Sequence, residues 1–302
     1  GELCIGRVAI VTGAGRGIGR AHALMLAEHG AAVVVNDLGT HVDGTSDGSG
    51  PASEVVAEIT AAGGQAVANH DDVADWEGAQ RLVNQAIETF GTLDVVVNNA
   101  GILRDRVLVN MTEYEWDAVI RTHLKGTFAP SRWAATYWRS RTKAGEANDA
   151  RIINTTSVSG LYGNAGQANY GAAKAGIAMF TQIAATELSR YGVTVNAIAP
   201  LALTRMNEGL PDMVDMTEAE REAMSARRIA QLSTWLASPQ SADITGRVFE
   251  ASTDWIAVAE GWHRGPVGAA VDDDAAVDAA MRNLLGNARP NADLDGRDRT
   301  ET

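Results

Sequence analysis

Short apolar runs rich in valine and isoleucine alternate along this chain with longer segments of helical character. Because strand and helix alternate four times over the first hundred residues, we predict an α/β fold with a parallel, doubly wound sheet. Ligands of such sheets bind at the carboxyl ends of the strands. The predicted strands are 7–12, 32–36, 65–70, 93–97, 152–153, 192–198 and 247–251, and the predicted helices include 52–62, 76–90, 226–237 and 272–281.

A glycine-rich loop follows the first predicted strand and opens a helix that Gly30 ends. Glycines in that position let the backbone turn tightly and approach a pyrophosphate, which the helix N-terminus attracts with its free amides. The strand–loop–helix context predicts a dinucleotide site of the Rossmann type. The residues that we expect to form this part of the site are Gly13, Arg16, Gly17, Ile18 and Gly19.

The second predicted strand ends at Asp37 and Leu38, and Asp37 comes 18 positions after Gly19. This is close to the spacing of the acid that binds an adenosine ribose. A carboxylate there accepts hydrogen bonds from both ribose hydroxyls and repels a 2′-phosphate, which favours NAD over NADP. Arg16 is a counter-signal, since a basic side chain could meet a 2′-phosphate. Alternatively, Asp37 only initiates a turn before Gly39.

Tyr170 and Lys174 are four positions apart on an alanine-rich predicted helix, so their side chains lie on one face. Ser157 stands thirteen positions before Tyr170, at the end of the preceding strand. An ammonium group one turn away favours the phenolate and lowers the pKa of a tyrosine. A serine hydroxyl can orient a substrate oxygen while the tyrosine exchanges its proton. The trio predicts an alcohol–carbonyl oxidoreductase, although tyrosine and lysine at this spacing also occur on ordinary helices.

The fourth predicted strand ends in Asn98, Asn99, Ala100 and Gly101. Small residues there leave room for a cofactor across the strand end, and asparagine side chains can tie neighbouring strands together. With the glycine loop and the serine, tyrosine and lysine, these motifs resemble the short-chain dehydrogenase/reductase family over about residues 5–250.

This resemblance implies roles for individual residues. Ser157 would orient the substrate, Tyr170 would be the acid or base, and Lys174 would also bind the nicotinamide ribose. Asp72 and Val73 would contact the adenine, and Thr204 would meet the nicotinamide amide. The expected catalytic residues are Ser157, Tyr170 and Lys174, and the expected cofactor-binding residues are Gly13, Arg16, Gly17, Ile18, Gly19, Asp37, Leu38, Asp72, Val73, Asn99, Ala100, Gly101, Tyr170, Lys174, Pro200, Leu203 and Thr204.

The chain departs from the family pattern at two positions. Leu201 replaces the glycine after Pro200, and His123 replaces an asparagine that helps to hold a water near the lysine. A histidine could hold the same water, add a titrating group, or merely fill a helix contact.

The segments 101–106, 123–128, 161–170 and 253–262 are similar to the dehydrogenase unit of the type 2 multifunctional enzyme of peroxisomal β-oxidation, and His123 fits that branch. The narrower resemblance implies oxidation of a 3-hydroxyacyl-CoA with NAD. The alternatives are an NADPH-dependent 3-oxoacyl-carrier-protein or other carbonyl reductase, a hydroxysteroid or alcohol dehydrogenase, and a non-catalytic NAD-binding regulator.

The composition of the chain argues against some classes of binding partner. The formal charge of −13 disfavours nucleic acid, and no apolar run is long enough to span a membrane. The single cysteine, Cys4, fits a reducing compartment, and we expect a cytoplasmic protein without a metal site. The family resemblance implies a homodimer or homotetramer.

The last third is expected to cover the substrate. We assign 1–251 to one NAD-binding domain, with a substrate cover at about 201–225 that holds Met206, Met213 and Met216. Flexible methionines suit an acyl chain, although they could equally pack a short helix. Residues 252–302 form a C-terminal extension over the substrate cleft or a partner subunit, with a disordered end from Asn287. The basic residues expected to receive the phosphates of CoA are Arg104, Arg106, Lys125 and Arg205.

Overall fold

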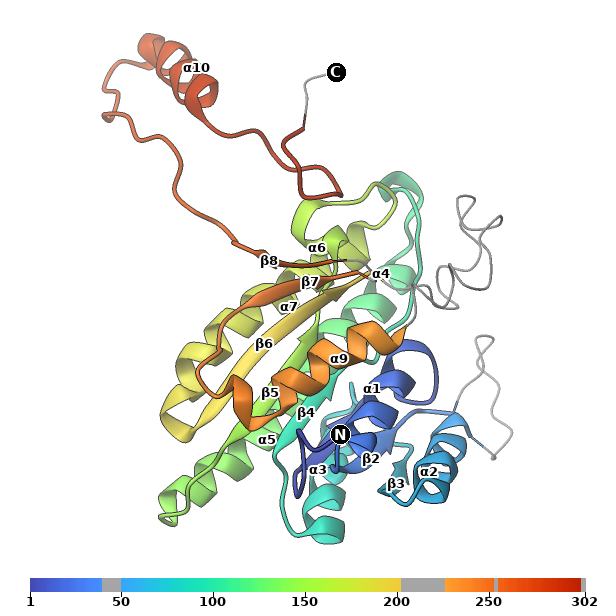
Figure 1. Cartoon of the computed structure of the whole chain (residues 1–302). Helices are drawn as coiled ribbons and strands as arrows, with labels where there is room; N and C mark the ends of the chain where they lie inside the picture. The colour runs from blue at the N-terminus through green and yellow to red at the C-terminus, as the bar shows by residue number, and fades with distance from the viewer. Residues whose placement is uncertain (40–49, 202–225, 253–254, 300–302) are drawn as a thin grey trace.

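An eight-stranded sheet runs through the centre of the computed structural model (Figure 1). The strand order is β3-β2-β1-β4-β5-β6-β7-β8, and every neighbouring pair is parallel except β7 and β8. The structure describes residues 1–39, 50–201, 226–252 and 255–299. The predicted parallel, doubly wound sheet is therefore confirmed.

The strands are short, and helices connect most of them. The strands are β1 Val8–Val11, β2 Ala32–Asn36, β3 Gln65–Asn69, β4 Val95–Asn98, β5 Ala150–Thr155, β6 Val193–Pro200, β7 Val248–Ala251 and β8 Ile256–Ala259. The α-helices are α1 Gly17–Glu28, α2 Pro51–Ala61, α3 Trp76–Phe90, α4 Glu113–Ile120, α5 Gly126–Lys143, α6 Val158–Tyr162, α7 Ala168–Leu188, α9 Ala226–Ala237 and α10 Val277–Asn287. The shorter turns are η1 Leu108–Asn110, the π-helical η2 Arg121–Lys125, η3 Ser189–Tyr191, η5 Pro239–Ser241 and η6 Asp274–Ala276.

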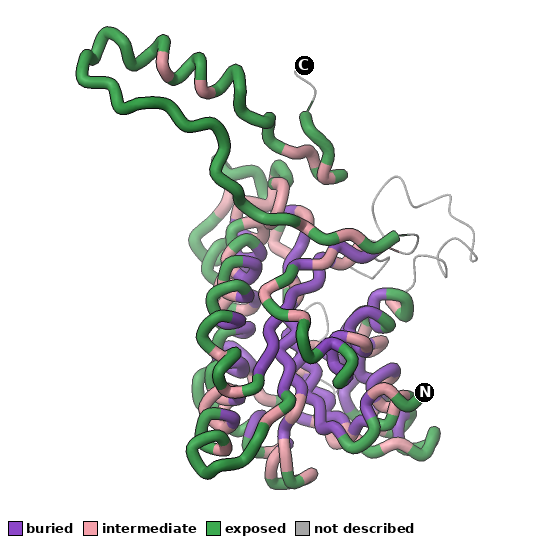
Figure 2. Tube along the Cα trace, turned by 60° about the vertical axis from the view of Figure 1, so that its left-hand side comes forward, coloured by how far each residue is buried: buried purple, intermediate pink, exposed green. Residues whose placement is uncertain are grey.

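Helices cover both faces of the sheet. On one face Leu26 of α1 and Leu236 of α9 pack against residues such as Val33. On the other face Leu82 of α3 and Trp138 of α5 pack with α7 against the sheet. Figure 2 shows the buried residues concentrated along the strands and the inner sides of the helices. Burial on both faces explains why the strands appear in the sequence as continuous apolar runs.

Local sequence patterns predicted the bounds of several helices correctly. The predicted helix 76–90 is α3, where the Asp75 side chain accepts a hydrogen bond from Gly78 N and Gly91 ends the helix with a φ of 84°. The fourth strand begins at Val95 rather than residue 93. Just before this start, the Asp94 carboxylate accepts a hydrogen bond from the Val8 amide of β1 at 2.8 Å.

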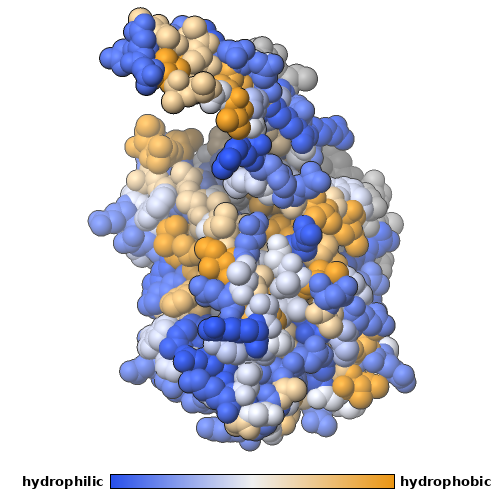
Figure 3. Space-filling model, turned by 90° about the vertical axis from the view of Figure 1, so that its left-hand side faces the viewer, coloured by the Kyte–Doolittle hydropathy of each residue, from blue (hydrophilic) through white to orange (hydrophobic). Residues whose placement is uncertain are grey.

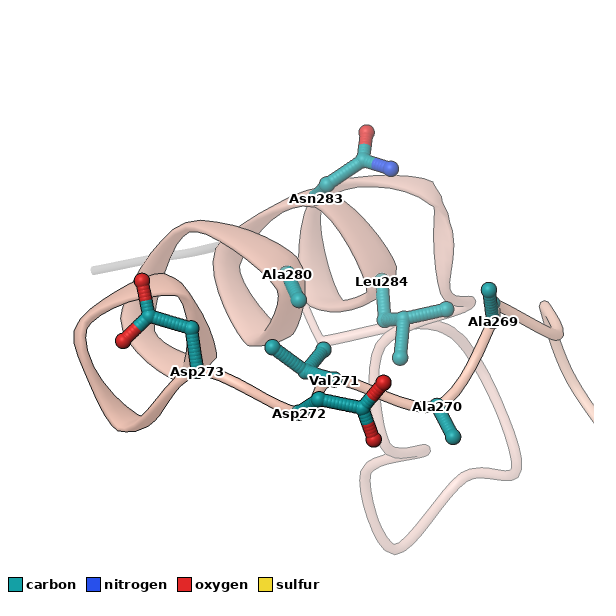
Figure 4. A pocket seen from close by; sticks show the side chains of 9 residues that line it. Ala269, Ala270, Val271, Asp272, Asp273, Ala280, Asn283 and Leu284 are labelled. Atoms are coloured by element: carbon teal, nitrogen blue, oxygen red, sulfur yellow. The ribbon is translucent and has the colours of Figure 1, made fainter.

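The sheet continues beyond the predicted domain boundary at residue 251. β8 pairs antiparallel with β7, and an exposed arm then leaves the body and carries α10 (Figure 1). The helix predicted at 272–281 lies at 277–287 instead. Figure 4 shows Val271 and Leu284 facing one another across a shallow pocket between α10 and the segment before it. None of the residues that line this pocket is a predicted site residue.

The end of the chain folds back towards α6. Residues 289–299 form a turn in which Ala292 bridges Asp298, and the Arg289 side chain pairs with Asp298 at 2.6 Å. This differs from the predicted disorder after Asn287. Most of the predicted substrate cover, 202–225, lies outside the described residues. Within the described ranges, no helix is both long enough and apolar enough to cross a membrane.

Candidate active site

The structure brings the three predicted catalytic residues together at the carboxyl end of β5. Ser157 caps α6, where its Oγ accepts a hydrogen bond from Ser159 N at 3.2 Å. Tyr170 and Lys174 lie on the first turns of α7, and the Lys174 Nζ is 5.5 Å from the centre of the Tyr170 ring. Lys174 Nζ donates a hydrogen bond to the Thr155 carbonyl at 2.7 Å, which fixes the ammonium group at the end of the strand.

Burial controls the ionisation of this group. It lowers the pKa of Lys174 to about 7, because a buried ammonium loses its hydration. It also raises the pKa of Tyr170, and the nearby Ser157 hydroxyl only partly opposes that rise. We had predicted that Lys174 lowers the pKa of Tyr170. The net shift of the Tyr170 pKa in the structure is upward, because burial disfavours the phenolate, so the effect of Lys174 itself stays a prediction.

His123 packs directly against the tyrosine. The two rings meet edge to face with their centres 5.1 Å apart, and His123 Nε2 lies 2.7 Å from the Ile102 carbonyl oxygen. Burial, reinforced by the charge of Lys174, lowers the pKa of His123 to about 3. The imidazole is therefore neutral near neutral pH, which argues against a titrating role. It fills the contact between η2 and the backbone of Gly101, where an added Cβ would lie 2.2 Å from His123 Cε1.

The glycine-rich loop is tightly packed around backbone atoms. Gly13 has a φ of +60°, and a Cβ at this position would lie 2.7 Å from Ala100 Cα. Asn99 Nδ2 donates hydrogen bonds to the Thr12 and Gly13 carbonyls, both at 3.1 Å. Arg16 precedes α1 without capping it, so the helix starts with free backbone amides. The cradle fits the pyrophosphate of a dinucleotide, as the sequence predicts.

Asp37 lies at the end of β2, beside this loop. Its Oδ2 accepts a hydrogen bond from Gly15 N at 3.0 Å, and its Oδ1 accepts one from Gly39 N at 3.0 Å. The second bond is the turn contact that we considered as an alternative. The carboxylate therefore turns the chain and is also held next to the glycine loop, while its contact with a ribose stays a prediction.

The structure describes only some of the remaining predicted cofactor residues. Asp72 follows β3 and pairs with Arg121 at 2.7 Å, while Val73 is buried beside it. Pro200 ends β6, whereas Leu203 and Thr204 lie outside the described residues. Among the described residues no group of three or more His, Cys, Asp and Glu side chains could hold a metal ion.

The basic residues that we expect to bind the phosphates of CoA differ in whether an acidic side chain pairs with them. Arg106 is committed to an ion pair with Glu115 at 2.9 Å. Arg104 donates only to the carbonyl of its neighbour Leu103, and Lys125 has no acidic partner in the described part of the chain. Arg205 lies outside the described residues. Of these four residues, Arg104 and Lys125 are the two without an ion pair among the residues that the structure describes.

The sequence analysis missed Asn169, which precedes Tyr170. This residue is fully buried, and its Nδ2 donates hydrogen bonds to the Arg104 and Glu115 carbonyls, both at 3.0 Å. It ties the start of α7 to the loop that follows β4. A polar residue beside the expected catalytic tyrosine was the available signal, but its partners are more than fifty positions away.

Comparison with known proteins agrees with this geometry. The family model described as short chain dehydrogenase matches residues 7–215. The chain belongs to the short-chain dehydrogenase family. It is therefore an oxidoreductase that acts on CH–OH groups, and its family binds NAD or NADP in general.

Relatives within this family have related names. Hydroxyacyl-CoA dehydrogenase ChsB1 of Mycobacterium tuberculosis is 47% identical over 81% of this chain and 76% of that protein. Peroxisomal multifunctional enzyme type 2 of Mus musculus is 45% identical over 83% of this chain, which spans only 32% of the mouse enzyme. The crystal structure of a short chain dehydrogenase from Mycobacterium avium has a TM-score of 0.87 and 54% identity, and covers 96% of this chain and 98% of that one. The resemblance seen in the sequence is confirmed.

Proposed function

We propose that this dehydrogenase oxidises a 3-hydroxyacyl-CoA to a 3-oxoacyl-CoA with NAD. The observation that carries the proposal is the grouping of Ser157, Tyr170 and Lys174 at the same edge of the sheet as the glycine loop. The relatives named hydroxyacyl-CoA dehydrogenase and peroxisomal multifunctional enzyme support the acyl-CoA substrate class.

Each side chain has a distinct task in this proposal. Ser157 donates a hydrogen bond to the substrate oxygen and orients it. Tyr170 accepts the hydroxyl proton as the carbonyl forms. Lys174, anchored to the Thr155 carbonyl, holds the nicotinamide ribose and stabilises the Tyr170 phenolate, which becomes a phenol as it accepts the proton. The bound nicotinamide supplies the chemistry that the chain lacks, which is acceptance of a hydride from carbon.

Asp37 supports NAD as the cofactor. Its carboxylate is fixed beside the glycine loop by Gly15 N, where an adenosine ribose would bind. A 2′-phosphate at that position would meet a negative charge. Arg16 has no side-chain partner in the described residues and favours the opposite choice, but it is attached to the loop rather than to the end of β2.

The experiment is a panel of substrates and cofactors with the intact chain. We expect reduction of NAD with 3-hydroxyacyl-CoA thioesters, and a rate at least about tenfold lower with NADP, which corresponds to about 1.4 kcal/mol. The same acyl groups on pantetheine, which lacks the nucleotide phosphates, test whether Arg104 and Lys125 contribute. A sterol and simple secondary alcohols complete the panel. Oxidation of these alone would contradict the acyl-CoA proposal.

A second candidate is an NADPH-dependent 3-oxoacyl-carrier-protein reductase. One relative with that printed name, the 3-oxoacyl-[acyl-carrier-protein] reductase of Synechocystis, is 42% identical over 80% of this chain and 94% of that protein. Arg16, which has no partner within the described ranges, is the feature that favours it. Faster reduction of a 3-oxoacyl group on the carrier protein with NADPH than with NADH would select this candidate.

We also propose that copies of the chain associate. Phe128 on α5 and Met179 and Ile183 on α7 are each more than two-fifths exposed. Figure 3 shows apolar side chains among hydrophilic ones on the side of the molecule where α5 and α7 lie. Sedimentation velocity measures the result directly, and we expect a dimer or tetramer. A monomer at micromolar concentration would contradict this proposal.

A further inference from the structure

The helix that Ser157 caps is attached to the sheet at its other end by a side-chain pair with one buried member. Tyr162, the last residue of α6, donates a hydrogen bond from its phenol to Glu250 Oε1 at 2.5 Å. Glu250 lies on β7 and is only 6% exposed. Burial and the neighbouring carboxylate both raise the pKa of Tyr162, so the phenol remains a donor.

The strand register shows how many strands lie between Ser157 and the Tyr162–Glu250 pair. Thr155 on β5 is the partner of Ile198 on β6, and Ala199, the next residue of β6, is the partner of Glu250 on β7. Two inter-strand steps amount to about 10 Å, close to the length of a five-residue helix with its caps. α6 therefore crosses the carboxyl ends of three strands, from Ser157 at β5 to Tyr162 at β7.

The middle of α6 rests on the lysine of the site. A Cβ at Gly160 would lie 2.6 Å from Lys174 Cβ and from Ala175 N, so the two helices are in backbone contact. A tilt of α6 would therefore disturb both Ser157 and Lys174. Two side-chain contacts oppose such a tilt at the far end of the helix: the hydrogen bond to Glu250, and Leu161, which packs against Ala197 and Val248.

The last turn of the chain covers the pair. A Cβ at Gly296 would lie 3.2 Å from the Tyr162 phenol oxygen, and Arg299 Nη2 donates to the Tyr162 carbonyl at 3.4 Å. The turn thus shields the phenol–carboxylate hydrogen bond from water, which strengthens it.

We propose that Tyr162 and Glu250 are positioning residues, which hold α6 so that Ser157 meets the substrate oxygen. This rests on the proposed role of Ser157. Neither side chain takes part in proton or hydride transfer. Because a misplacement of about 1 Å can cost about 100-fold in rate, loss of the pair lowers kcat without weakening the binding of NAD.

The test compares the wild type with Tyr162→Phe, Glu250→Gln and the double variant Tyr162→Phe/Glu250→Leu. Tyr162→Phe leaves a buried carboxylate unpaired, so we expect a lower Tm and a kcat reduced by about 10- to 100-fold. Glu250→Gln keeps an acceptor for the phenol and should retain most of kcat. Tyr114→Phe is the matched control, since Tyr114 is 72% exposed.

The double variant separates positioning from stability. Removal of both polar groups restores the Tm because no buried charge is left without a partner. We expect kcat to stay low although the Tm recovers and the Kd for NAD is unchanged. Recovery of kcat together with the Tm, or an unchanged kcat in Tyr162→Phe, would overturn the proposal.

Rates are measured as ratios to the wild type on whichever alcohol of the panel the wild type oxidises fastest. Failure of the acyl-CoA proposal would appear as the wrong preferred substrate. Failure of the positioning proposal would appear as variant ratios near one, so the two results are distinguishable.

Discussion

Burial changes the chemistry of Lys174 strongly. In the unfolded chain its pKa is about 10.5, and burial lowers this to about 7 in the fold. Between these values the unfolded chain carries a proton that the folded chain has released. The resulting stability is fully present above about pH 10.5 and is lost as the pH falls to about 7.

We therefore expect a pH-dependent difference between the wild type and Lys174→Met. From about pH 7 to about pH 9 the free energy of unfolding of the wild type should rise relative to the variant by roughly 1–3 kcal/mol. Urea unfolding at both pH values measures this. Lys143→Met at the exposed end of α5 is the control, and an equal pH dependence for Lys174→Met and the wild type would count against the buried ammonium.

At the same scale, the sequence predicted which residues meet but not how they ionise. The four-residue spacing of Tyr170 and Lys174 placed both on one face of α7. The sign of the shift in the tyrosine pKa depended on burial by α6, η2 and the sheet. No local pattern around Tyr170 records that burial.

Among the elements, the contact between η2 and the loop after β4 supports the tyrosine. His123 reaches from η2 to the Ile102 backbone and fills the space beside Gly101. The π-helical geometry of η2 is a local irregularity of the kind that often occurs at functional sites. The fit leaves no room for a side chain at position 101.

We expect Gly101→Ala to destabilise the fold by about 1–3 kcal/mol, since the new Cβ would clash with the His123 ring. In Gly101→Ala/His123→Ala the clash is absent, so the two substitutions should be non-additive by at least about 0.5 kcal/mol. A double-mutant cycle by urea unfolding measures the coupling. Gly265→Ala is the control because no atom lies within 4 Å of its added Cβ. Simple additivity would refute the steric argument.

Elements with strong local signals were predicted well, and those defined by tertiary contacts were not. Buried apolar runs identified the parallel strands, and Asp75 and Gly91 marked the ends of α3. β8 was missed because it is a partly exposed edge strand that depends on antiparallel pairing with β7. The Tyr162–Glu250 pair was missed because its members are 88 positions apart.

On the scale of the whole molecule, the candidate active site and the ion pairs of Asp149 lie at opposite edges of the sheet. The site lies at the carboxyl ends of the strands, as the doubly wound topology predicts. At the amino ends, Asp149 pairs with Arg7 at 2.7 Å and with Arg151 at 2.6 Å, and both arginines are buried. This cluster therefore ties the amino ends of β1 and β5 together.

The central claim is that Tyr170 takes the proton of an alcohol that Ser157 holds. The most direct measurement is the single-turnover rate of Tyr170→Phe with NAD and a 3-hydroxyacyl-CoA, alongside the Kd for NAD. We predict that the rate falls by about 100- to 10,000-fold, because a general base is lost, while the Kd changes by less than about threefold. A single-turnover rate equal to that of the wild type would contradict the account.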